Sequence, residues 1–99
     1  MKKNIAILGS TGSIGKTTVQ IISNEKKSFN VILLTTNKNY SEILKQISKL
    51  KPKNLVINNF YYFNKIKKKF KKSKLKIFNN LDDFLKNNKL KIDYTMCAI

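Results

Sequence analysis

Three glycines near the start of the chain are spaced in a way that could bind a phosphate group. Gly9 would let the chain turn sharply, Gly12 would leave room for a pyrophosphate beside the backbone, and Gly15 would let a helix pack tightly on the sheet. Free N–H groups and the dipole at the start of such a helix attract anions, and the three hydroxyl side chains of the segment can add hydrogen bonds. The candidate cofactor-binding residues, here called the glycine loop, are Gly9, Ser10, Thr11, Gly12, Ser13, Ile14 and Gly15.

The surroundings of the glycine loop support this prediction. An apolar run precedes it and an amphipathic segment follows, which is the strand–loop–helix context that a dinucleotide-binding loop requires. The spacing is G-x-x-G-x-x-G, whereas the commoner fingerprint is G-x-G-x-x-G. We therefore predict a phosphate site, with a purely structural glycine-rich turn as the alternative.

A second candidate contact follows the second apolar run of the chain. An NAD enzyme usually carries an acidic residue there for the ribose 2′-hydroxyl, but the segment Thr35–Asn39 contains none. Lys38 would instead favour a 2′-phosphate, so the sequence favours NADP(H) over NAD(H). The alternative is that Lys38 is one more surface lysine among twenty-one.

A P-loop is a rival interpretation of the same region, because Gly15-Lys16-Thr17 resembles the end of a Walker A motif. That motif needs glycine at position 10, where this chain has Ser10. No apolar strand ends in an aspartate that could hold magnesium, since Asp93 precedes its strand. We expect Lys16 to be an exposed residue of the first helical turn.

Residues for acid–base catalysis are scarce. The chain has no histidine, which is the commonest general acid–base residue. Its five acidic residues do not cluster in a metal-ligand pattern, and the adjacent Asp82 and Asp83 favour the positive end of a helix dipole. We therefore expect no catalytic residue and no metal site in this chain.

The formal charge of +16 comes entirely from lysine, without any arginine. A nucleic-acid reader usually carries arginine for bidentate contacts, and codon bias explains an excess of lysine, asparagine and isoleucine. We expect no specific nucleic-acid partner. A small lysine-rich module that binds RNA or another polyanion through Lys65–Lys76 remains the alternative from a different functional class.

The remaining composition favours the cytoplasm. Cys97 is the only cysteine, so no intrachain disulfide can form. No apolar run reaches the roughly 18 residues of a membrane span, and the N-terminus does not resemble a signal peptide. We expect no membrane partner.

Strand and helix patterns alternate along the chain. Expected strands are Asn4–Leu8, Phe29–Thr36, Leu55–Ile57, Leu75–Phe78 and one starting at Asp93; expected helices are Ser13–Asn24, one from Asn39 to before Pro52, Asn59–Lys72 and one capped by Asn79 or Asn80. This order predicts an α/β fold, a Rossmann-like doubly wound parallel sheet with helices on both faces.

The apolar spacing also predicts which helical residues face the sheet. In the first helix these are Ile14, Thr18, Ile21 and Ile22, with Val19 beside them, and in the third they are Phe60, Phe63, Ile66 and Phe70. We expect Asn39 to cap the second helix in a reciprocal pair with Glu42, and the fourth helix to carry Phe84 and Leu85.

Together these residues resemble the 1-deoxy-D-xylulose 5-phosphate reductoisomerases. The similarity begins with I-L-G-S-T-G-S-I-G at Ile7–Gly15 and continues through Phe29 and the V-I-L-L strand. It then takes in the turn Asn37–Asn39 and reaches the apolar end Met96–Ile99. It covers nearly all of this chain but only about the first quarter of a family member.

The resemblance implies an NADPH-dependent oxidoreductase of non-mevalonate isoprenoid biosynthesis. The family isomerises 1-deoxy-D-xylulose 5-phosphate and reduces the product to 2-C-methyl-D-erythritol 4-phosphate, as a homodimer with Mg²⁺ or Mn²⁺. The resemblance also implies that residues 11–14 contact the pyrophosphate and that Asn37, Lys38 and Asn39 contact the 2′-phosphate end. Asn37 departs from the family, since many members have glycine there.

The resemblance also implies what this chain lacks. Residues 1–99 would be the N-terminal part of an NADPH-binding domain, truncated at an apolar strand, without the metal- and substrate-binding or C-terminal domains. We expect such a fragment to be inactive on its own.

Overall fold

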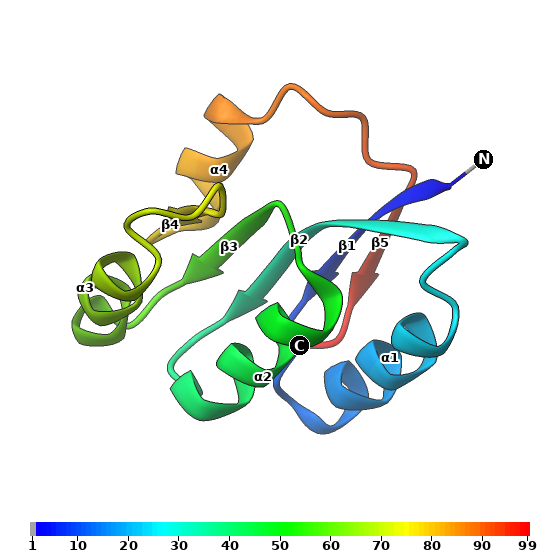
Figure 1. Ribbon diagram of the computed structural model, residues 1–99, viewed down its shortest axis with the longest axis horizontal. Helices are drawn as coiled ribbons and strands as arrows, with labels where there is room; N and C mark the ends of the chain where they lie inside the picture. The colour runs from blue at the N-terminus through cyan, green and yellow to red at the C-terminus, as the bar shows by residue number, and fades with distance from the viewer. Residues whose placement is uncertain (1) are drawn as a thin grey trace.

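The protein alternates strands and helices along its whole length. A computed structural model describes residues 2–99 (Figure 1). Its elements are β1 (Lys3–Leu8), α1 (Ser13–Asn24), β2 (Phe29–Thr36), α2 (Tyr40–Leu50), β3 (Asn54–Ile57), α3 (Phe60–Lys69), β4 (Lys76–Phe78), α4 (Leu81–Asn87) and β5 (Tyr94–Cys97). Each expected strand and helix is present, although α3 ends three residues before the expected Lys72.

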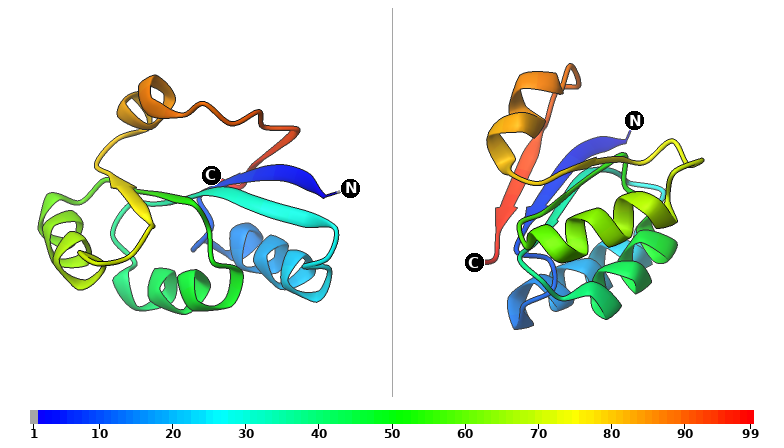
Figure 2. Two further views of the ribbon diagram at one scale, coloured as in Figure 1. Left: turned by 45° about the horizontal axis from the view of Figure 1, so that its top comes forward. Right: turned by 90° about the vertical axis from the view of Figure 1, so that its left-hand side faces the viewer.

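The five strands form one parallel sheet in the order β4-β3-β2-β1-β5. The chain winds outward from β1 to β4 and then returns across the sheet to place β5 on the other side of β1. Helices α1, α2 and α3 cover one face, and α4 lies on the opposite face (Figure 2). The expected doubly wound parallel sheet is therefore confirmed.

Two apolar clusters hold the helices to the sheet. The larger packs three helices onto one face and includes Ile7, Ile22, Ile43 and Ile66, each almost fully buried. The smaller lies under α4 and is centred on Phe84. Aliphatic β-branched and leucine side chains fill both faces of β2, which is why its sequence is a continuous apolar run.

The buried face of α1 differs from the expected one. Ile14 and Ile21 are 65% and 56% exposed, whereas the residues facing inward are Gly15, Thr18, Val19 and Ile22. The buried stripe is shifted by one residue from the expected one, because Gly15 must face the backbone of the preceding loop. In a similar way, Phe60 and Leu85 lie outside the core, while Phe63, Ile66, Phe70 and Phe84 pack into it.

Asparagine caps define three of the four helix starts. The side-chain oxygens of Asn39, Asn59 and Asn80 accept from backbone N–H groups three residues further on, at the starts of α2, α3 and α4. The cap by Asn39 confirms the prediction. Its expected reciprocal bond is replaced, because the Glu42 carboxylate accepts a hydrogen bond from Gln46.

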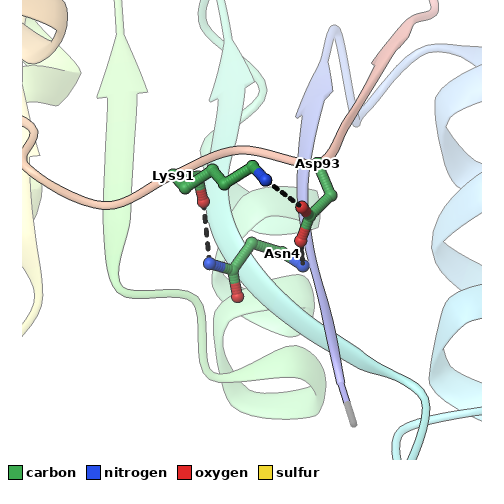
Figure 3. A network of polar contacts seen from close by, with 3 residues as sticks. All are labelled: Asn4, Lys91 and Asp93. Atoms are coloured by element: carbon green, nitrogen blue, oxygen red, sulfur yellow. Dashed lines mark hydrogen bonds and ion pairs between the residues drawn. The ribbon is translucent and has the colours of Figure 1, made fainter.

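Polar contacts fix the return of the chain to β5. The backbone N–H of Asn4 donates to the Asp93 carboxylate (2.8 Å), and the Asn4 amide donates to the Lys91 carbonyl (2.7 Å; Figure 3). Lys91 and Asp93 also form an ion pair of 3.8 Å. These contacts join the α4–β5 connection to the start of β1 and so set the register of the edge strand.

None of the helices in residues 2–99 has both the length and the apolar character needed to cross a membrane.

Candidate functional site

The glycine loop lies at the carboxyl end of β1, where the sheet reverses its strand order. β5 runs beside β1, and the N–H of Ala98 donates to the Leu8 carbonyl (2.8 Å). Open α/β sheets bind ligands in the crevice at such a switch point. The topology therefore places the predicted phosphate loop where this fold class carries its ligand.

Gly9 is required by the turn itself. Its φ is +75°, in the left-handed region that side-chain-bearing residues rarely adopt. A Cβ on Gly9 would also lie 2.8 Å from the Ile99 side chain. The expectation that Gly9 permits a sharp turn after the strand is confirmed.

Gly15 is required by contact with the loop rather than with the sheet. A Cβ here would lie 2.1 Å from the Gly9 carbonyl oxygen and 2.6 Å from the Ser10 carbonyl carbon. The expectation of close packing is therefore confirmed, but its partner is corrected. The first turn of α1 rests directly on the backbone of the glycine loop.

Neither the backbone conformation nor the packing of the protein requires glycine at position 12. Its backbone is extended, with φ −76° and ψ 176°, and a Cβ would make only ordinary contacts of 3.8 Å and 3.9 Å. The residue is exposed. An exposed glycine that the protein's own packing does not demand leaves open the space that a pyrophosphate needs beside the backbone.

The N-terminus of α1 offers free donors at the same place. Alone among the four helices of residues 2–99, α1 has no side-chain cap bond, and Gly12 is its N-cap residue. The first hydrogen bond of the helix runs from the Lys16 N–H to the Gly12 carbonyl (2.8 Å). The Gly12 N–H donates to the Gly9 carbonyl (3.3 Å), and the N–H groups of Ser13, Ile14 and Gly15 lie at the positive end of the helix dipole.

The end of β2 fastens the loop in place. The N–H of Gly9 donates to the Thr35 hydroxyl (2.8 Å), and the N–H of Ser10 donates to the Thr35 carbonyl (2.9 Å). The hydroxyls of Thr11 and Thr36 lie 2.6 Å apart. Sequence reasoning did not assign a role to these two β2 threonines. The sequence feature that could have identified them is the pair of hydroxyl side chains at the end of an otherwise apolar strand.

The hydroxyls of the loop do not all face solvent. Ser10 is fully buried, and its hydroxyl donates to the Thr35 carbonyl at 3.4 Å. This corrects the expectation that the Ser10 hydroxyl is free for a phosphate, because the loop turns that side chain inward against β2. Ser13 is exposed, and Thr11 is half-buried.

The turn Asn37–Asn39 follows β2 directly, so the threonine contacts place it beside the glycine loop. All three residues are exposed. The Asn37 carbonyl accepts from the Asn59 N–H (2.8 Å), which ties the turn to the start of α3. The Asn39 side chain caps α2, leaving Lys38 as the cation that the turn presents to solvent.

The P-loop interpretation finds no support in this geometry. Lys16 is exposed in the first turn of α1, as expected. Asp93 bonds to Asn4 near the start of β1, at the opposite end of the strands from the glycine loop. It therefore cannot hold a cation at the loop. In residues 2–99 no group of three or more His, Cys, Asp or Glu side chains could hold a metal ion.

A parallel doubly wound sheet, a glycine loop at its switch point and an uncapped first helix define the class of Rossmann-like dinucleotide-binding domains. Comparison with known proteins gives the family. The family model of 1-deoxy-D-xylulose 5-phosphate reductoisomerase matches residues 5–99, and the chain belongs to this family.

Individual relatives agree with this assignment. The reductoisomerase of Pelagibacter ubique is 46% identical over 99 residues, which cover 98% of this chain and 26% of that protein. That of Buchnera aphidicola is 40% identical over 74 residues, 75% of this chain and 19% of that protein. The chain thus spans about a quarter of the length of the Pelagibacter relative.

Solved structures show the same fold. The reductoisomerase of Zymomonas mobilis in complex with NADPH superposes with a TM-score of 0.86 at 27% identity, covering all of this chain and 26% of that one. A reductoisomerase in complex with NADPH, fosmidomycin and magnesium gives a TM-score of 0.84 at 21% identity, over 98% of this chain and 24% of that one.

Replacing the packed Gly15 should destabilise the protein much more than replacing the exposed Gly12. Gly15→Ala should lower the free energy of unfolding by about 2 kcal/mol or more, because the new methyl group overlaps backbone atoms that cannot move aside. Gly12→Ala should change it by less than about 1 kcal/mol, since its backbone suits alanine and its Cβ meets no close neighbour. Urea unfolding of both variants measures the difference, and equal losses would contradict the distinct roles.

Proposed function

We propose that this chain binds NADPH across the glycine loop and the turn Asn37–Asn39. The observation that carries the proposal is Gly12, an exposed glycine with open space above it at the uncapped N-terminus of α1. The NADPH complex of the Zymomonas reductoisomerase, which shares the fold at 27% identity, supports the choice of cofactor.

The proposed contacts divide between the pyrophosphate in the middle of the cofactor and the 2′-phosphate at its adenosine end. Thr11, Gly12, Ser13 and Ile14 would hold the pyrophosphate through backbone N–H groups at the helix start. Asn37, Lys38 and Asn39 would hold the 2′-phosphate, where Lys38 supplies the positive charge. NADPH supplies a hydride when it is bound, and the role of this chain is to bind and orient it.

The activity of the longer protein follows from the family. We propose that residues 1–99 are the NADPH-binding part of a cytoplasmic, homodimeric reductoisomerase acting on 1-deoxy-D-xylulose 5-phosphate. Relatives about four times as long support this proposal, as do relatives solved with magnesium and fosmidomycin. The metal and substrate sites would then belong to parts of the protein outside these residues.

One observation favours a second candidate, a polyanion-binding module. A hollow of about 830 Å³ at the amino ends of β3 and β4 has five lysines in its lining, Lys51, Lys53, Lys74, Lys76 and Lys89, and no acidic residue. It lies at the opposite end of the strands from the glycine loop. The two candidates therefore place the ligand on different parts of the molecule.

The Gly12→Ala variant tests the proposed site directly. A methyl group on Gly12 would occupy the space over the backbone, so we expect NADPH affinity to fall by about tenfold or more, about 1.4 kcal/mol. Isothermal titration calorimetry of wild type and variant measures this, with circular dichroism as the control for an intact fold. Unchanged affinity in the folded variant would contradict the site.

The Lys38→Ala variant tests cofactor preference. Loss of the cation should weaken NADPH binding by about tenfold and leave NADH binding nearly unchanged, because only NADPH carries the 2′-phosphate. Lys16→Ala is the matched control, an exposed lysine of the neighbouring helix that should affect both cofactors little. Equal losses for NADPH and NADH in Lys38→Ala would contradict the assignment.

A further inference from the structure

Gln46 is a polar residue on the buried face of α2. It lies beside Ile43 and Ile47 on the face that packs against the sheet, and it is only 1% exposed. Burying an amide costs free energy unless its polar atoms find partners. The contacts of this side chain therefore decide what it contributes.

Both hydrogens of the Gln46 amide have acceptors. The Nε2 group donates to the Ser10 carbonyl (2.8 Å) and to the Glu42 carboxylate (3.3 Å). Two oxygen acceptors fix the orientation of the amide, because the reverse orientation would set oxygen against oxygen. Oε1 is left buried without a hydrogen-bond partner among residues 2–99.

The two acceptors connect Gln46 to the two parts of the proposed cofactor site. Ser10 lies in the glycine loop, and its N–H and hydroxyl already point to β2. Glu42 lies in the first turn of α2, where its N–H donates to the Asn39 side chain at 3.3 Å. A continuous chain of hydrogen bonds thus runs from Ser10 through Gln46 and Glu42 to Asn39.

These hydrogen bonds, together with those of the β2 threonines, hold the residues on both sides of the turn Asn37–Asn39. On one flank of the turn, the β2 threonines hold the glycine loop, and on the other flank Gln46 holds it from α2. The loop and the turn therefore keep a fixed spacing, which a cofactor must match to reach both at once.

We propose that Gln46 is a positioning residue that couples the glycine loop to the Asn37–Asn39 turn, so that the pyrophosphate and the 2′-phosphate of NADPH are bound as one unit. The inference rests on the proposed NADPH function. Gln46 also contributes to folding, and the unpartnered Oε1 offsets part of the stabilisation from its two hydrogen bonds.

Gln46→Met separates positioning from stability. Methionine has a similar volume and removes the unpartnered acceptor, but it leaves the buried Ser10 carbonyl without its donor, so the melting temperature should fall by no more than about 8 °C and the variant should stay folded at 25 °C. NADPH affinity should fall by about tenfold, since the loop and the turn no longer keep their spacing. Affinity for 2′-AMP, which reaches only the turn, should stay the same.

Lys45→Met is the matched control, because it makes the same replacement at the neighbouring, exposed position of α2. It should leave the affinity for NADPH and 2′-AMP unchanged. Gln46→Leu provides a second apolar replacement at the buried position and should behave as Gln46→Met does.

The outcomes separate this inference from the proposed function. If wild type does not bind NADPH, the proposed function fails. If wild type binds NADPH and the folded Gln46→Met variant binds it equally well, only the coupling role fails. A large drop in melting temperature in both apolar variants would assign Gln46 to folding and also overturn the coupling role.

Discussion

The contact between Gly15 and the backbone of Gly9 and Ser10 is the constraint on which the rest of the site depends. Because no side chain can fit between them, the first turn of α1 rests directly on the loop that follows β1. This contact rotates the buried stripe of α1 by one residue and leaves Ile14 exposed. It also places the start of α1 at the switch point of the sheet.

The second element of the site depends on the same arrangement. Once the loop is held against α1, its N–H groups and hydroxyls reach the end of β2, and Thr35 and Thr36 bind it there. The turn that follows β2 is thereby placed beside the loop. Two segments more than twenty residues apart in the sequence form one surface, which suits a ligand with a central pyrophosphate and a further phosphate near one end.

Most of the fold could be predicted from the sequence because the patterns are local. Apolar runs marked the strands, asparagines marked the starts of three helices, and alternation of the two elements indicated a parallel sheet. The rotation of α1 could not be predicted, because it depends on a backbone contact with the preceding loop. The partner of Glu42 was missed for a similar reason, since Gln46 becomes available only when α2 packs against that loop.

The site shows the same division between local and tertiary information. The spacing of the three glycines predicted the loop and the need for Gly9 to turn, and the structure agrees. The inward orientation of Ser10 was not predictable, since a serine in a glycine-rich segment resembles a phosphate ligand until β2 is placed beside it. Polar residues within apolar segments, such as Thr35 and Gln46, were the available signal for the supporting contacts.

Backbone amide shifts of the ¹⁵N-labelled chain on titration with NADPH would test the central claim most directly. We expect the shifts to concentrate in residues 9–15 and 37–39 and the lysine-rich segment Lys65–Lys76 to be unaffected. Shifts confined to that lysine-rich segment and the hollow beside it, with the glycine loop unchanged, would contradict a dinucleotide site and favour non-specific binding of anions.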